Sequence, residues 1–249
     1  MYTRRVIFNL AEKYNIVYRN LTKQRRNVFS YQIERNQFPS GYLKNILQYS
    51  SDSPLKCWNC EFVYKSDLFC SKCKVIQEPP ENITYFEIMG VPRDYNISIT
   101  EIHNKYRELQ KMLHPDKFGN KSEKELSELL SSLVNKAYST LTNPLKRGLY
   151  MLELNNISIP EGTTNLNPEF LMEIMERNEE IEEAVDNEKK IIKLMQENKE
   201  VLSTLIKEVL EAFQNEDIER AKSILIKMKY YDSIETRLKK LKHDLGIVD

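Results

Sequence analysis

Glycine is scarce in this chain, with only 6 among 249 residues, against the roughly 7% that is usual in proteins. This scarcity counts against a glycine-rich phosphate loop and against an all-β sandwich, since both depend on tight turns. The chain also lacks any run of 18 apolar residues, so we expect no membrane insertion. A surplus of one charge is missing too: 37 Lys and Arg balance 37 Asp and Glu, which argues against a general polyanion binder.

Helix-forming residues are abundant instead, because the chain is rich in Glu, Lys and Leu and 41% of its residues are hydrophobic. We therefore expect an all-α protein with short non-helical segments at polar, Pro-containing stretches. The predicted division is an N-terminal extension (1–33), a linker (34–54), a cysteine module (55–77), a helical unit (83–155) and an antiparallel three-helix bundle (167–247) with breaks near Asn187 and Asn215.

The four cysteines are confined to one short segment, as C-x2-C-x9-C-x2-C at Cys57, Cys60, Cys70 and Cys73. Each pair can chelate from one turn, and four thiolates suit a structural Zn2+ with a closed tetrahedral shell. Such a shell leaves no open position for catalysis. Two disulfides, a rubredoxin-like iron site and a redox C-x-x-C pair remain as alternatives. Thiolate ligation also implies a compartment in which free thiols persist.

The first 33 residues are basic and amphipathic. They contain seven Lys and Arg and a single acid, Glu12. Apolar residues recur at helical spacing, at Val6, Leu10, Tyr14, Val17 and Leu21. This pattern predicts a mitochondrial transit peptide, with an unstructured basic tail as the alternative.

The segment from Ser98 to His114 predicts one amphipathic helix. Ser98 and Glu101 have the spacing of a capping box at its start. One face carries Ile102, Tyr106, Leu109 and Leu113, while Asn104, Arg107, Lys111 and His114 lie off it. Pro115 lacks a backbone N–H and disfavours helical geometry at His114, so the helix must end there.

A second helix follows, with a further capping box at Ser122 and Glu125 and an apolar stripe at Leu126, Leu130, Leu133, Ala137 and Leu141. The two helices predict a hairpin with His114-Pro115-Asp116 in its connecting loop. A catalytic His114–Asp116 dyad is disfavoured, because Pro115 points the two side chains apart and no Ser or Cys nucleophile is near. We therefore expect no catalytic residues.

The first helix of the C-terminal bundle has an unusual outer side. Phe170, Ile174, Ile181 and Val185 share one face and predict its core contact. Leu171, Met172 and Met175 lie away from that face, in a segment (169–188) with nine acids and one base. Flexible Met side chains on an acid-rich surface are typical of an adaptable binding site. Packing against the preceding linker is the alternative.

The middle unit resembles a J domain of the DnaJ co-chaperone family, through "YFEIMGVP", "ITEIHNKYRELQKMLHPDKF" and "NKAYSTLTNPLKRGLYML". In that family the HPD loop and a basic helix engage a DnaK-type heat-shock chaperone and stimulate its ATP hydrolysis. The resemblance implies a chaperone-binding set of His114, Pro115, Asp116, Arg107, Lys111 and Lys117. Such cations act through steering and complementarity with an acidic surface.

Residues 55–245 together resemble the HscB/Jac-type J proteins of iron–sulfur cluster assembly, with the cysteine module similar to that of animal-type members. The resemblance implies that "NPEFLMEIMERNEEIEEAV" binds an IscU-type scaffold. The implied contacts are Leu171, Met172, Met175, Glu176, Glu179, Glu183 and Tyr230, with Tyr231 replacing Tyr230 if the register shifts by one. Gly148 departs from the family, which has a small helix former there. In an exposed helix a glycine costs about 1 kcal/mol relative to alanine.

The expected protein is therefore a co-chaperone rather than an enzyme, with structural Zn2+, a mitochondrial DnaK-type chaperone and an IscU-type scaffold as partners. The expected location is the mitochondrial matrix or a mitochondrion-derived organelle, with a cytoplasmic pool left open. Alternatives are a J protein with another client and a thiolate-iron electron carrier. A nucleic-acid binder is disfavoured, because residues 55–77 mix acids with lysines and form no basic stripe.

Overall fold

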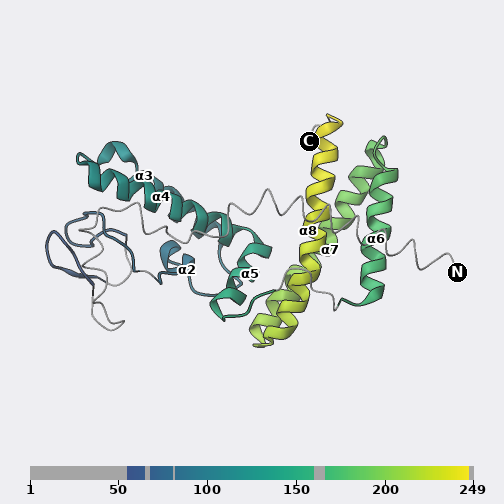
Figure 1. Ribbon diagram of the computed structural model, residues 1–249, viewed down its shortest axis with the longest axis horizontal. Coiled ribbons are helices and arrows are strands. Elements are labelled where there is room, and N and C mark those ends of the chain that lie inside the picture. The colour runs from purple at the N-terminus through teal and green to yellow at the C-terminus, as the bar shows by residue number, and fades with distance from the viewer. Residues whose placement is uncertain (1–54, 65–67, 81, 160–165, 247–249) are drawn as a thin grey trace, which may run out of the picture. The chain divides into compact units, whose positions relative to one another are not determined.

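The computed structural model describes residues 55–64, 68–80, 82–159 and 166–246 (Figure 1). The predicted transit peptide and the whole of the predicted linker (34–54) fall outside these residues. Within them the chain forms seven α-helices, a 3-10 turn and a two-stranded sheet, which confirms the all-α class. None of the described helices is long and apolar enough to span a bilayer.

The cysteine module contains two turns with the same backbone pattern. Strands β1 (Leu55–Lys56) and β2 (Val63–Tyr64) pair antiparallel around the first turn, and a Phe69–Ile76 bridge closes the second. In the first turn the N–H of Cys57 donates to the carbonyl of Phe62 at 2.9 Å; in the second, Cys70 donates to Val75 at the same distance.

Each turn holds a non-glycine residue in the left-handed region, Glu61 at φ 56° and Lys74 at φ 61°. L-residues rarely adopt this geometry, and glycine usually occupies such positions. Both residues directly follow the second cysteine of their pair. The chain therefore accepts local backbone strain to give the two turns one shape.

Helix α2 (Tyr85–Met89) opens the middle unit, where Thr84 and Glu87 form a reciprocal capping box. Helices α3 (Ile99–Met112) and α4 (Lys121–Thr142) form the predicted hairpin and lie side by side (Figure 1). The 3-10 turn η2 (Pro115–Lys117) connects them. Helix α5 (Pro144–Leu154) begins directly after α4, with Pro144 at its first position, where the missing N–H costs nothing.

The hairpin core agrees with the predicted faces. Ile102, Leu109 and Leu113 are buried on the α3 side, and Tyr106 is half-buried. On α4, Leu130, Ala137 and Leu141 are buried while Leu126 and Leu133 are half-buried; Ser127 and Val134, which the stripe did not include, are also buried. The Ser127 hydroxyl donates to the Leu113 carbonyl at 3.0 Å, so a polar group enters the core satisfied.

The predicted cap of α4 is wrong. Asn120 caps this helix, and its side chain accepts from the N–H of Glu123 at 2.7 Å. Helix α4 therefore begins before Ser122, and the Ser122–Glu125 spacing falls inside its first turns. Ser98 does cap α3, accepting from the N–H of Glu101 at 3.3 Å.

Three helices form the C-terminal bundle: α6 (Pro168–Glu183), α7 (Glu188–Gln214) and α8 (Ile218–Asp244). Asn187 caps the start of α7 and Asn215 its end, which confirms both predicted breaks. Helices α7 and α8 pack along their length (Figure 1). Their seam buries Ile191, Leu194, Leu205, Val209, Ala212, Ala221, Leu225, Met228, Ile234 and Leu238.

Val185 was predicted to be a core residue, and this is wrong. Helix α6 ends at Glu183, with Ala184 as its C-terminal cap. Beyond that point the chain turns, so helical phase no longer places the next side chain. Ala184 is fully buried and Val185 is 41% exposed.

Gly148 is not in an exposed helix, contrary to expectation, because α5 packs against α8 at this residue. A Cβ added there would lie 2.5 Å from Cδ2 of Leu225 and 3.1 Å from its Cδ1. Leu225 is fully buried and has little room to move. The glycine therefore permits a close approach between the two helices, and its conformational cost is offset by packing.

A buried aromatic contact adjoins the α5–α8 contact. The Tyr95 ring is 2% exposed and packs on Phe213 of α7 at 5.5 Å between centroids. The guanidinium of Arg147 lies over the Tyr95 ring at 4.8 Å, and its Nη1 donates to the Leu141 carbonyl. Burial raises the pKa of Tyr95 to about 12, against the lowering effect of Arg147. The tyrosine thus stays neutral beside the cation.

We predict that Gly148→Ala lowers the free energy of unfolding by about 1–2 kcal/mol, since overpacking costs about 1–3 kcal/mol and outweighs the gain in helix propensity. In a Leu225→Ala background the same change becomes stabilising, because the added methyl enters vacated space. Denaturant unfolding of the four proteins checks this double-mutant cycle. An equal effect in both backgrounds would contradict the close approach.

Candidate functional site

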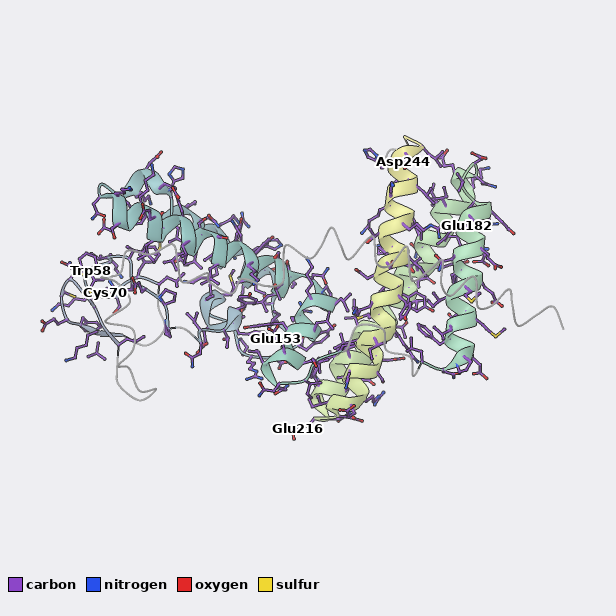
Figure 2. The ribbon with its side chains drawn as sticks, viewed as in Figure 1. Trp58, Cys70, Glu153, Glu182, Glu216 and Asp244 are labelled. Carbon is purple, nitrogen blue, oxygen red and sulfur yellow. The ribbon has the colours of Figure 1, made fainter. Side chains whose placement is uncertain are left out.

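The four cysteine side chains converge on one point of the cysteine module. Their Sγ atoms all lie within 4.8 Å of one another, with Cys57–Cys73 at 3.5 Å and Cys60–Cys70 at 3.7 Å. Cys57 and Cys70 are buried, Cys60 and Cys73 are half-buried, and all four are free of disulfides. Figure 2 labels Cys70 and Trp58 in this module.

This geometry suits a tetrahedral metal ion. Zn–S bonds of about 2.3 Å place tetrahedral sulfurs about 3.8 Å apart, close to the two shorter separations found here. Four soft sulfur donors without a carboxylate or imidazole match Zn2+ or Fe and disfavour Mg2+ or Ca2+. The predicted ligand set therefore fits a metal, and the disulfide alternative does not describe this structure.

The backbone supports negative charge at several of these sulfurs. The N–H of Val75 donates to Cys73 and is the main reason that the pKa of this thiol falls to about 6. The N–H of Cys73 similarly lowers the pKa of Cys70. At Cys60 the N–H of Phe62 lowers the pKa, but burial and the three other thiols raise it to about 12. Thiolates so close together repel one another, and a cation removes that repulsion.

The His-Pro-Asp sequence lies at the tip of the α3–α4 hairpin. His114 has extended geometry (φ −64°, ψ 125°), as expected before a proline. Its Nδ1 accepts from the N–H of Asp116 at 3.4 Å. The side chains of His114 and Asp116 are 61% and 87% exposed, so the loop presents both to solvent. Nδ1 of His114 also lies 3.5 Å from Oδ2 of Asp116, so the expectation that Pro115 points these two side chains apart is wrong. Among the described residues, neither side chain has a hydrogen bond to a Ser or Cys.

The predicted chaperone-binding cations are exposed. Arg107 and Lys111 lie on the outer side of α3, and Lys117 lies in η2. A shallow hollow of about 430 Å3 on α3 is lined by Asn104, Arg107, Glu108, Lys111 and Met112. The structure thus places these cations on the hairpin that carries His114.

The outer side of α6 carries an apolar patch, as the sequence predicted. Leu171 is 38% exposed, Met172 61% and Met175 44%. Glu176, Glu179 and Glu183 are exposed as well. Glu183 has an intrachain partner, because Nζ of Lys190 lies 3.1 Å from its carboxylate.

The two neighbouring tyrosines of α8 differ in exposure. Tyr231 is 4% exposed and its hydroxyl donates to Glu173 of α6. Burial is the main cause of the raised pKa of Tyr231, and the hydrogen bond to Glu173 and the charge of its carboxylate raise this pKa further. Tyr230 is half-buried and packs edge-on against Phe170 of α6, at 5.6 Å between centroids. Of the two candidates, Tyr230 therefore has the more accessible side chain.

Polar contacts fasten α6 to its neighbours, and sequence analysis missed them. Arg177 pairs with Glu197 of α7 at 2.7 Å. Arg237 of α8 contacts Asn178 and also Glu182, which Figure 2 labels. The isolated position of Arg177 among nine acids was the one available signal. Helical spacing alone does not reveal which acidic residue of another helix forms the ion pair with Arg177.

Residues 84–150 match the family model of the DnaJ domain. A hairpin with an exposed His-Pro-Asp tip, together with this match, defines a J-domain protein. Residues 166–239 match the model described as the HSCB C-terminal oligomerisation domain.

Similarity to whole proteins narrows this class. The chain is 38% identical over 195 residues to iron-sulfur cluster co-chaperone protein HscB of Mus musculus, covering 74% of this chain and 81% of the relative. It is 36% identical to the Arabidopsis thaliana homolog, covering 78% and 77%. The crystal structure of human co-chaperone protein HscB superposes with a TM-score of 0.69 at 37% identity, covering 76% of this chain and 98% of that one. The chain belongs to the HscB family of iron–sulfur cluster co-chaperones.

We predict that Glu197→Gln loosens α6 in a pH-dependent way. The hydrogen bond from Arg177 is the main cause of the lowered pKa of Glu197. A carboxylate with a lowered folded-state pKa stabilises the fold above its unfolded pKa, and this contribution is lost as the pH falls through the folded value. Because both side chains are partly exposed, we expect less than about 1 kcal/mol at pH 7.

Urea unfolding at pH 7 and at successive values below 4.5 measures this difference between wild type and variant, which should shrink on acidification. Glu128→Gln, at an exposed carboxylate of α4, serves as the control. A difference that is constant with pH would contradict the ion pair.

Proposed function

We propose that this protein binds an IscU-type iron–sulfur scaffold through α6 and delivers it to a mitochondrial DnaK-type chaperone. The His114-Pro115-Asp116 loop stimulates ATP hydrolysis by that chaperone, and this promotes transfer of the cluster. The cluster is cargo, and the protein itself makes and breaks no bond. The exposed patch of Leu171, Met172 and Met175 is the observation that carries this proposal.

The α6 patch has the chemistry of a protein-docking surface. Three large apolar side chains stand exposed on a helix whose core face is already occupied by Phe170, Ile174 and Ile181. Leaving them in water has a cost that a partner surface recovers on binding. Glu176 and Glu179 supply a polar rim, which favours a partner with basic residues at its edge. Tyr230, beside Phe170, extends the patch onto α8.

The hairpin tip has a complementary task. Pro115 fixes the backbone so that His114 and Asp116 stand in one arrangement before binding, which reduces the entropy lost on docking. Arg107, Lys111 and Lys117 steer an acidic chaperone surface towards this tip.

Holding both partners on one chain explains how the protein works without catalysing a reaction. A scaffold captured on α6 is confined near a chaperone engaged at the hairpin tip, so the second encounter becomes intramolecular. An effective concentration of about millimolar is typical for such tethering. ATP hydrolysis then closes the chaperone on a client that is already in place.

A structural Zn2+ held by Cys57, Cys60, Cys70 and Cys73 completes the proposal. The ion supplies charge compensation and cross-links the two turns, with no position open for chemistry. We further propose the domain division given from the sequence, with the transit peptide at residues 1–33 and a mitochondrial location, in accord with the thiolate-rich site. One fungal relative supports this location, since a similar protein is the mitochondrial J-type co-chaperone jac1 of Schizosaccharomyces pombe.

The primary experiment measures steady-state ATP turnover by a mitochondrial DnaK-type chaperone, with and without this protein and the scaffold. The proposal is supported if this protein and the scaffold together raise ATP turnover by more than the sum of the increases that each produces alone. Stimulation without this synergy would keep the J-domain role and assign a different client. Absence of any stimulation would reject both.

We predict that Leu171→Ala with Met172→Ala weakens scaffold binding at least tenfold, because it removes two exposed side chains from the patch centre. Stimulation of the chaperone without scaffold should stay at the wild-type level. Calorimetric titration with the scaffold measures the affinity. Val185→Ala removes an equally exposed apolar side chain outside the patch and serves as the control. An unchanged affinity in the double variant would rule out α6 as the docking surface.

We predict the converse for His114→Gln, in which ATPase stimulation is lost and scaffold affinity is retained. The variant keeps the polar volume but loses the imidazole at the hairpin tip. His243→Gln, at an exposed histidine near the end of α8, is the matched control. Wild-type stimulation by His114→Gln would reject the role of the loop.

A further inference from the structure

One buried amide touches the metal centre without being a ligand. Gln77 follows the second cysteine turn and is only 1% exposed. Its backbone N–H donates to the Leu68 carbonyl at 2.9 Å, which fixes its position beside the second turn. Its side chain crosses to the first turn, where Nε2 lies 3.4 Å from Sγ of Cys57. Burying a Gln side chain has a cost unless its polar atoms are satisfied, so this position requires an explanation.

The contacts of this side chain identify its nitrogen. Nε2 also lies 3.0 Å from the Val75 carbonyl and 3.0 Å from the Ile76 carbonyl. Two carbonyl oxygens and a sulfur are all acceptors, and an amide oxygen placed there would be repelled by each of them. The group that faces Cys57 is therefore the NH2 donor.

An N–H donor at a thiolate changes the behaviour of the sulfur. It withdraws electron density from the lone pairs, which makes the sulfur less nucleophilic and holds its lone pair towards the metal. The N–H of Asn59 also approaches Cys57 at 3.4 Å, so this sulfur accepts two N–H groups. Among the described residues, Gln77 is the one residue outside both turns whose side-chain amide donates to a cysteine sulfur.

We propose that Gln77 is a positioning residue of the metal centre, whose amide hydrogen bond orients the Cys57 thiolate and makes its metal bond slow to break. This inference rests on the proposed metal in the cysteine cluster. It gives the first turn a link to the second that does not pass through the metal. Outer-shell partners of this kind are typically worth 10–100-fold in metal affinity.

The first test measures zinc affinity of the full chain by competition with a chromophoric chelator. Gln77→Leu keeps the side-chain volume and removes the donor, and we expect its zinc dissociation constant to rise 10–100-fold. Gln77→Glu places a carboxylate oxygen against the thiolate and should weaken binding further. Gln110→Leu, which removes an amide that bonds Asn135 on the helical hairpin, is the matched control and should leave zinc affinity unchanged.

A second measurement distinguishes a specific effect on the Cys57 thiolate from a general loosening of the cysteine module. In the zinc-loaded protein, alkylation of Cys57 should accelerate in Gln77→Leu, while that of Cys70, which is equally buried and has no Gln77 contact, should change much less. In the cobalt-loaded protein at saturating metal, the sulfur-to-cobalt charge-transfer band should move to longer wavelength in Gln77→Leu. This second measurement depends on the bond to sulfur and not on how much metal is bound.

The outcomes distinguish the inference from the proposal on which it rests. A wild-type chain that holds no zinc would reject the metal centre and this inference with it. Zinc held by the wild type and equally by Gln77→Leu would overturn the role of Gln77 alone. Equal acceleration at all four cysteines would also overturn it, because the amide would then only fill space.

Discussion

The contact of α5 with α8 at Gly148 is the constraint on which the helical part of the chain depends. Helix axes approach closely only where the intervening side chains are small, and here the small residue is a glycine facing the fully buried Leu225. Through this contact, and through the packing of Tyr95 on Phe213, the apolar interior of the helical unit (83–155) continues into that of the C-terminal bundle. The helical unit and the bundle therefore share one core, and a packing defect at this point affects both.

Two exposed groups contrast with this shared interior. At the hairpin tip the chain exposes polar side chains on a backbone stiffened by Pro115. On α6 it exposes apolar side chains on a helix fastened by the Arg177–Glu197 and Arg237–Glu182 pairs. Exposed polar side chains at a loop are ordinary, whereas the cluster of Leu171, Met172 and Met175 on α6 departs from the usual burial of large apolar side chains. Sites of this kind are expected where a surface has been kept for a partner.

Much of this arrangement was predictable from sequence, because its causes are local. Cysteine spacing, the proline after His114 and the apolar stripe of α3 each depend on residues a few positions apart. Gly148 was misinterpreted because its neighbour, Leu225, is 77 positions further along the chain, and spacing does not report such contacts. The prediction that Val185 is buried was wrong for another reason. Helical spacing places side chains only within the helix, and α6 ends at Glu183. The ion pairs of Arg177 and Arg237 required the packing of three helices to be known.

Trp58 gives the cysteine module an optical property of its own. It is the single tryptophan of the chain, with its ring 60% exposed while its Nε1 donates to the Ile76 carbonyl across the two turns at 2.8 Å. Indole emission therefore originates in the cysteine module alone, whereas far-ultraviolet circular dichroism originates almost wholly in the helices. A single unfolding experiment followed by both signals reports whether the cysteine module and the helices unfold together, because coincident curves are the mark of one cooperative unit.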